Sequence, residues 1–287
     1  MAHRATLDEQ RERYAVKIAR SSWITDPRIE RAFAAIPREA FLPPPPWTVF
    51  PPGGWLKQPT SDPADLYDDV LVVLDSRRGV NNGQPSLHAA WLAAVDPQAG
   101  ETAIHVGAGT GYYTAILAML VLPDGHVYAY EIDERLAEMA KRHLEAFRHV
   151  IVRAESALGA DLLEADVIYV NAGLAAPDPA WLKTLKTQGR LIFPWQPFGR
   201  GGGGVAMLVT RAEGGLRARA TMQVGFIECE GAEPGETSGG HMDFETVERT
   251  RSVWLTQERP PDETATAVYE KVWFSSEEIP ARGPEPA

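Results

Sequence analysis

Short, continuous apolar runs alternate with amphipathic stretches through the middle of the chain. The apolar runs cover residues 69–75, 102–106, 126–132, 150–155, 165–172 and 189–195, and they lack the polar alternation of half-exposed strands. Helical patterns occupy 85–95, 112–120, 133–147 and 179–186. Buried strands that alternate with helices predict an α/β fold: a doubly wound, mainly parallel sheet covered by helices on both faces.

The two ends of the chain carry other patterns. Residues 7–20 and 25–36 predict helices, whereas the proline-rich stretch 41–54, FLPPPPWTVFPPGG, predicts a stiff loop without regular structure. Residues 198–221 predict an antiparallel hairpin, and 251–255 and 266–274 are two further β-like runs in a short tail. We therefore expect N-terminal helices and a proline-rich insertion in 1–60, a main domain in 61–230, and a partly disordered extension in 231–287.

Composition and charge narrow the class of protein. The 287 residues carry a net charge of −11, which argues against binding to nucleic acid because no basic excess is present to neutralise phosphates. The single cysteine, Cys229, excludes a cysteine-based zinc site and suits a reducing compartment, and no metal site is expected. No apolar run approaches the length of a membrane span, so the sequence predicts a cytoplasmic protein without a membrane partner.

One glycine-rich stretch, IHVGAGTGYYTAIL, lies between a predicted strand and a predicted helix. Gly107, Gly109 and Gly111 occupy alternate positions, which is the context of a nucleotide-binding loop, although their spacing disfavours the G-x-G-x-x-G of a dinucleotide site. Glu131 and Glu155 end the next two predicted strands, where a carboxylate can accept hydrogen bonds from ribose hydroxyls or lie near a base. The structural alternative is an ordinary strand-to-helix turn with acidic caps.

With these residues the chain resembles the class I S-adenosylmethionine-dependent methyltransferases, and more narrowly the protein-L-isoaspartate O-methyltransferases. The narrower resemblance covers about residues 13–230. It rests on DPRIERAFAAIPREAFLP with its Pro-Arg-Glu-x-Phe end, on GVNNGQPSLHAAWL, on the glycine loop, and on ADVIYVNAG and VGFIEC further along. The glycine loop is specific only to the superfamily, and the Pro-Arg-Glu-x-Phe stretch points to the narrower family.

The resemblance implies a Rossmann-like methyltransferase fold and a carboxyl O-methyltransferase. Its cofactor would be S-adenosylmethionine, and its substrate a peptide or protein with a carboxylate acceptor. Direct displacement of a methyl group needs alignment and charge neutralisation rather than a covalent nucleophile. By this resemblance, the cofactor-binding positions are His105, Gly107, Ala108, Gly109, Gly111, Tyr112, Glu131, Ile132, Glu155, Ser156 and Asn171.

Three positions depart from the family's pattern. Gly83 stands where the family has a serine beside the reacting carboxylate, and Ser86 or Asn82 are the candidates to replace it. Asn171 stands where the family usually has threonine, so Gly83, Ser86 and Asn171 are the expected substrate-side positions. His105 stands where an acid normally precedes the glycine loop, near the amino group of the cofactor; a neutral imidazole can accept a hydrogen bond there.

Several neighbouring side chains admit two interpretations. Tyr112 and Tyr113 either flank the cofactor or pack on the sheet, and His88 is either a packed residue or a base. Arg77 and Arg78 either meet a substrate carboxylate or form a solvated pair in a loop.

The departures also leave three functions open. The first is an isoaspartyl-type methyltransferase, the second a methyltransferase for a dedicated peptide or small molecule, and the third an inactive binding protein of the same fold. The sequence leaves the acceptor and the oligomeric state open.

Overall fold

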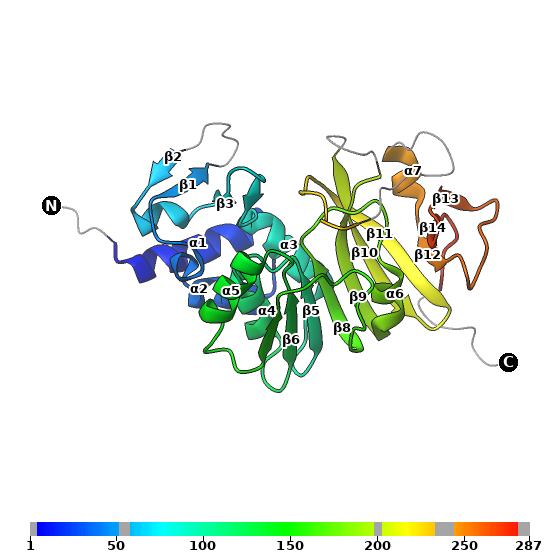
Figure 1. Cartoon of the computed structure of the whole chain (residues 1–287), viewed down its shortest axis with the longest axis horizontal. Helices are drawn as coiled ribbons and strands as arrows, with labels where there is room; N and C mark the ends of the chain where they lie inside the picture. Colours follow the sequence, from blue (N-terminus) through cyan, green and yellow to red (C-terminus); the bar gives the residue numbers. More distant parts are fainter. Residues whose placement is uncertain (1–4, 52–57, 198–202, 233–243, 281–287) are drawn as a thin grey trace. The chain divides into compact units, whose positions relative to one another are not determined.

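The computed structural model describes residues 5–51, 58–197, 203–232 and 244–280 (Figure 1). Contacts between residues divide the chain into two compact units. The first unit comprises Met1–Gly100 with Ala108–Ala154, and the second comprises Glu101–Gly107 with Glu155–Ala287. The chain passes from one unit to the other inside the glycine loop, between Gly107 and Ala108.

The first unit contains five α-helices among the described residues: α1 (Leu7–Ser21), α2 (Pro27–Ala35), α3 (Pro85–Val95), α4 (Tyr112–Leu120) and α5 (Glu134–His143). Two of their starts follow directly from the sequence. Thr6 and Glu9 form a reciprocal capping box at α1, and Asp26 caps α2 with Pro27 in its first turn. Short 3-10 helices, η1 (Arg38–Phe41) and η2 (Pro63–Leu66), connect the helices to a small sheet.

This small sheet corrects one expectation. Its strand order is β2 (Gln58–Thr60), β1 (Trp47–Phe50), β3 (Leu71–Asp75), β4 (Val80–Asn81), all antiparallel, so the proline-rich stretch does contain a strand. Trp47 and Val49 alternate inward and pack in a buried cluster with Leu66 and Val72. Prolines flank β1, with Pro46 directly before it and Pro51 directly after it, and Pro59 lies in the edge strand β2, where a missing N–H is tolerated.

Parallel strand pairs confirm the predicted Rossmann-like α/β fold. In the first unit, β6 (His126–Tyr130) pairs with β7 (Val150–Arg153), and α5 connects them. In the second unit, β8 (Ala165–Val170) pairs in parallel with both β5 (Thr102–Val106) and β9 (Leu185–Trp195). The helix before β9, α6 (Pro179–Thr184), is shorter than expected because Leu185 already pairs with Ala165.

Antiparallel strands continue the sheet of the second unit beyond β9. The predicted hairpin is confirmed as β10 (Gly204–Ala212) and β11 (Gly215–Val224). The two tail runs form β12 (Ser252–Leu255), β13 (Ala265–Val268) and β14 (Val272–Ser275), which follow β11 in the order β12-β14-β13. A short helix, α7 (Phe244–Arg249), precedes them.

The described part of the tail is integrated into the core of the second unit. Every residue of β14 is buried, and Phe274 stacks on Trp195 with a centroid separation of 4.2 Å. The indole Nε1 of Trp195 donates hydrogen bonds to the carbonyl of Ala175 and, at 3.1 Å, to the hydroxyl of Tyr269. The expected disorder of the extension falls mainly on residues 233–243 and 281–287, which lie outside the described residues.

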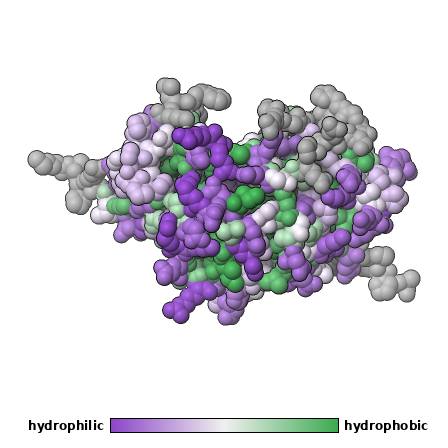
Figure 2. All heavy atoms as spheres, in the orientation of Figure 1, coloured by the Kyte–Doolittle hydropathy of each residue, from purple (hydrophilic) through white to green (hydrophobic). Residues whose placement is uncertain are grey.

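The surface mixes polar and apolar side chains. On the face drawn in Figure 2, hydrophilic residues surround smaller hydrophobic areas. Among the described residues, every helix falls short of the length and hydropathy needed to cross a bilayer.

Candidate functional site

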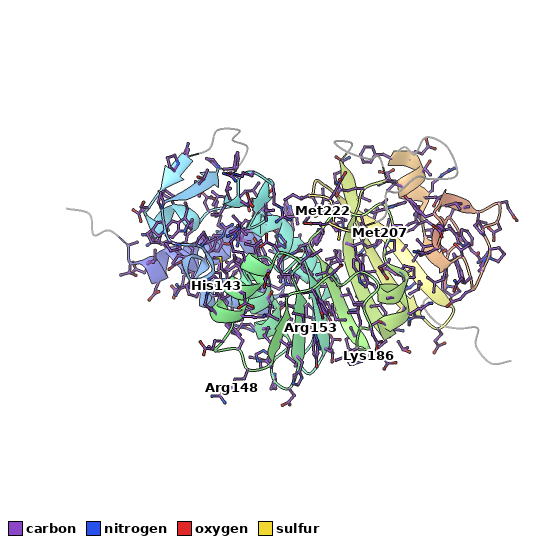
Figure 3. All side chains as sticks on the ribbon, viewed as in Figure 1. His143, Arg148, Arg153, Lys186, Met207 and Met222 are labelled. Atoms are coloured by element: carbon purple, nitrogen blue, oxygen red, sulfur yellow. The ribbon has the colours of Figure 1, made fainter. Side chains whose placement is uncertain are left out.

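The part of the glycine loop in the first unit, 108–111, is a tight turn closed by its own backbone. The N–H of Gly111 donates to the carbonyl of Ala108 at 3.0 Å, and Gly111 is the N-cap of α4 in the left-handed conformation, with φ of +94°. A Cβ at Gly111 would lie 2.8 Å from Cδ1 of Leu144, so both conformation and space require glycine there. His143, at the end of α5 and labelled in Figure 3, donates through Nδ1 to the carbonyl of Thr110 at 2.9 Å and so ties the turn to α5.

Glu131 is fixed against this loop. One carboxylate oxygen, Oε2, accepts the N–H of Gly109 at 2.7 Å, and the other, Oε1, accepts the N–H of Asp133 at 2.9 Å. The residue is only 8% exposed, and burial raises the pKa of its carboxyl while the two backbone N–H groups act in the opposite direction. Since each carboxylate oxygen has a second lone pair, the group retains capacity for ligand hydroxyls. Ile132, the next residue, is 44% exposed.

The side chain of Tyr112 packs in the core of the first unit. It is 1% exposed and lies edge-on to Phe33 and Phe41, with its hydroxyl 3.4 Å from that of Tyr14. Burial raises the pKa of the Tyr112 phenol well above its usual value. The first turn of α4 thus directs this ring toward α1 and α2, as the packing interpretation expects, and the contact of position 112 with the cofactor stays a prediction.

Gly83 has no room for a side chain. Its φ is +60°, and a Cβ would lie 2.2 Å from Nε2 of His88. The imidazole of His88 stacks on Tyr113 at a centroid separation of 3.6 Å, and the hydroxyl of Tyr113 donates to the carbonyl of Gly83 at 3.2 Å. His88 thus occupies the space into which a side chain at position 83 would project.

The two candidates to replace a serine at position 83 have structural partners. The hydroxyl of Ser86 donates to Oδ2 of Asp69 at 2.7 Å, and its N–H donates to Oδ1 of the same carboxylate at 2.8 Å. Asn82 is 6% exposed, and its Oδ1 accepts hydrogen bonds from Arg38. Both residues help to fasten the segment that enters α3.

Arg38 is a structural residue whose contacts were not anticipated. It is fully buried and donates to the carbonyls of Leu66, Val70 and Gly83 at 3.1, 2.7 and 3.3 Å. A buried guanidinium is tolerated when its donors are satisfied in this way. The sequence singles out the Pro-Arg-Glu-x-Phe stretch that contains Arg38, but only the fold shows that this arginine holds the Gly83 segment.

In the second unit, His105 and Asn171 form a hydrogen-bonded pair. The Nδ2 of Asn171 donates to Nε2 of His105 at 2.8 Å, and the N–H of Asn171 donates to the carbonyl of Val106. His105 is fully buried, and burial lowers its pKa to about 3, so the ring is neutral. Among the described residues, the Oδ1 of Asn171 is a buried acceptor with no hydrogen-bond partner. A Cβ at Gly107 would lie 3.4 Å from the backbone of Asn171.

Glu155 and Ser156 lie beyond a strand that is shorter than expected. β7 ends at Arg153, so Glu155 does not end the strand, and its side chain is exposed. The hydroxyl of Ser156 accepts the N–H of Leu158 at 3.1 Å, which closes a local turn. Their expected contact with the cofactor stays a prediction.

Comparisons with known proteins agree on one family. A family model described as protein-L-isoaspartate(D-aspartate) O-methyltransferase matches residues 9–233. The chain is 31% identical over 192 residues to the protein-L-isoaspartate O-methyltransferase of Aeropyrum pernix, covering 65% of this chain and 66% of that protein. It is 30% identical over 172 residues to the Thermotoga maritima protein of the same name, covering 58% of this chain and 50% of that one. The chain thus spans between half and two thirds of the length of these two relatives.

Solved structures give the same picture of the fold. A protein-L-isoaspartate O-methyltransferase superposes with a TM-score of 0.65 at 25% identity, covering 77% of this chain and 66% of its own. A putative protein-L-isoaspartate O-methyltransferase from Plasmodium falciparum, solved with S-adenosyl-L-homocysteine, superposes with a TM-score of 0.60 at 18% identity. It covers 76% of this chain and 97% of its own. The second likeness shows the fold alone.

Proposed function

Because this chain belongs to the protein-L-isoaspartate(D-aspartate) O-methyltransferase family, we propose that it methylates the carboxylate of isoaspartyl residues in peptides or proteins with S-adenosylmethionine. The observation that carries the proposal is the Glu131 carboxylate, fixed beside the bare glycine loop by the N–H groups of Gly109 and Asp133. The loop admits a ligand close to the backbone, and the carboxylate accepts from hydroxyls, as an adenosine ribose requires.

The donors and acceptors of the chain suit this cofactor in two places. In the first unit, Glu131 would accept the ribose hydroxyls. In the second unit, the unpartnered Oδ1 of Asn171 would accept from the ammonium of the methionine moiety. The neutral His105 holds the Asn171 amide in place through Nε2 and brings no positive charge that would repel that ammonium.

The bound cofactor would supply an electrophilic methyl group on a sulfonium. A carboxylate oxygen of the substrate would take this methyl group as the carbon–sulfur bond breaks, which would leave a methyl ester and a thioether. A carboxylate is already deprotonated near neutral pH, so this chain needs to orient the acceptor rather than remove a proton from it. Gly83, Ser86 and Asn171 remain the proposed substrate-side positions, with Ser86 oriented by Asp69.

The proposal also covers the class of substrate and the cellular compartment. A net charge of −11 disfavours a nucleic-acid substrate, and the single cysteine suits the reducing cytoplasm. Peptides and proteins with an isoaspartyl linkage are therefore the proposed partners.

Methyl transfer to a matched pair of peptides tests the proposal. The peptides have one sequence and differ only in an isoaspartyl or an aspartyl linkage, and mass spectrometry follows the added methyl group. We expect methylation of the isoaspartyl peptide and background signal with its aspartyl twin. Background signal with both peptides would exclude isoaspartyl methylation.

A second candidate function is methyl transfer to a dedicated peptide or small molecule. The absence of a side chain at Gly83, where His88 fills the space, favours this alternative. It predicts that the chain binds S-adenosylmethionine and methylates neither peptide of the pair.

A further inference from the structure

The hairpin formed by β3 and β4 contacts the glycine loop of the first unit. Leu74, on β3, has its Cδ1 3.8 Å from the position that a Cβ on Gly109 would occupy, so its side chain lies against the loop. Beyond β3, the turn of the hairpin carries Arg78, whose Nη1 donates to Oδ2 of Asp133 at 2.5 Å. The hairpin is thus attached on one side to the loop and on the other to the residue that caps α5.

These contacts join two others to form a closed ring. Gly109 donates its N–H to Oε2 of Glu131, and Asp133 donates its N–H to Oε1 of the same carboxylate. The ring therefore runs from Leu74 to Gly109, Glu131, Asp133 and Arg78, and returns through the hairpin. Asp133 also accepts the N–H of Leu136 through Oδ1, so its carboxylate caps α5 and accepts from Arg78 at the same time.

The ring places two carboxylates within one short turn. Burial raises the pKa of the Glu131 carboxyl, and the backbone N–H groups of Asp133 and Gly109 act against it; the charges of Asp133, which raises this pKa, and Arg78, which lowers it, contribute less. The Arg78 and Asp133 side chains are 44% and 16% exposed, so this ion pair is partly screened by water.

We propose that Arg78 is a positioning residue for the cofactor: its ion pair with Asp133 holds the hairpin against the glycine loop and so keeps the loop and Glu131 in the arrangement that receives the ligand. This inference rests on the proposed function, since it assigns Arg78 to the same ligand site. Arg78 acts through Asp133 and Glu131, and its guanidinium need not touch the ligand.

Binding of S-adenosylhomocysteine tests the role of Arg78. Arg78→Ala should weaken binding by about fivefold, the value of a partly exposed ion pair. Arg78→Lys should restore most of the affinity, and Arg77→Ala, on the same turn, should remain within about twofold of the wild type.

A second variant separates the ion pair from a general loss of structure. Asp133→Asn keeps a good helix cap but removes the negative charge beside Glu131. In that background, Arg78→Ala should no longer weaken binding, because its partner charge is already gone. Equal affinity of Arg78→Ala and the wild type, or the same loss from Arg78→Ala with and without the Asp133 carboxylate, would overturn the inference while the proposed function stands. Absence of binding by the wild type would overturn the proposed function, and the inference with it.

Discussion

The side-chain amide of Asn171 donates a hydrogen bond to Nε2 of His105 across 2.8 Å, from the end of β8 to the neighbouring strand β5. Both residues stand where the sequence departs from its family's pattern, so the two altered positions contact each other directly. The ring accepts through Nε2, so its proton resides on Nδ1. A neutral, hydrogen-bonded pair thus replaces the charge that an acid at position 105 would carry.

Replacing His105 should change how stability depends on pH. Burial lowers its pKa to about 3, whereas the unfolded chain has an ordinary histidine near 6.5. Between these values the unfolded state binds more protons, so this group's contribution to stability is fully present above about pH 6.5 and is lost as pH falls. From pH 7 to pH 5 the loss should be about 2 kcal/mol.

Urea unfolding at several pH values measures this effect. His105→Gln keeps an acceptor for Asn171 but does not titrate, so its free energy of unfolding should fall less than that of the wild type between pH 7 and pH 5. If the free energy of unfolding falls equally for both proteins, His105 takes up a proton as readily in the folded state as in the unfolded state.

Adding a side chain at Gly83 should destabilise the first unit. A serine there meets Nε2 of His88 and adopts a left-handed backbone, which together should lower the free energy of unfolding by about 2–4 kcal/mol. Gly79→Ser is the matched control, because Gly79 has φ of +72° but nothing within 4 Å of its Cβ position. Gly79→Ser should lower the free energy of unfolding by only about 1 kcal/mol. Equal losses in thermal or chemical unfolding would mean that His88 moves away freely.

Removing the buried guanidinium of Arg38 should also lower stability. Arg38→Leu leaves buried carbonyls of Leu66, Val70 and Gly83 without this donor, and we expect a loss of about 2–4 kcal/mol in the free energy of unfolding. Arg31→Leu changes an exposed arginine on α2 and should have an effect within about 0.5 kcal/mol. If Arg38→Leu lowers the free energy of unfolding no more than the control does, the structural role of Arg38 is contradicted.

The tail should contribute to the stability of the second unit. Phe274→Ala removes a fully buried ring that stacks on Trp195, and we expect a loss of about 3–5 kcal/mol. Phe244→Ala alters an aromatic side chain that is 42% exposed and should cost much less. If guanidinium unfolding shows similar values for both, the tail does not form part of the core.

Local patterns predicted the parts of the fold that depend on neighbours in sequence. The apolar runs predicted the parallel strands, the helical patterns in 7–20 and 25–36 predicted α1 and α2, and the glycine-rich stretch predicted the loop before α4. The strand at Trp47–Phe50 was missed because flanking prolines conceal an inward alternation that only pairing with β3 reveals.

Contacts between distant segments could not be predicted from the sequence. The position of Gly83 was known, but the imidazole that fills its side-chain space comes from the first turns of α3. Tyr112 follows the loop directly, yet the direction of its ring depends on how α1 and α2 pack. The bond between Asn171 and His105 required the register of β5 against β8, which no local pattern contains.

Calorimetric titration with S-adenosylmethionine, comparing the wild type with Glu131→Ala, tests the central claim most directly. Glu134→Ala, an exposed change three residues further along, is the control. We predict that the wild type and the control bind alike and that Glu131→Ala loses roughly 1.5–3 kcal/mol of binding free energy, because a hydrogen-bonded carboxylate is removed. Unchanged affinity in Glu131→Ala, or no binding by the wild type, would contradict the assignment of this loop and carboxylate to the cofactor.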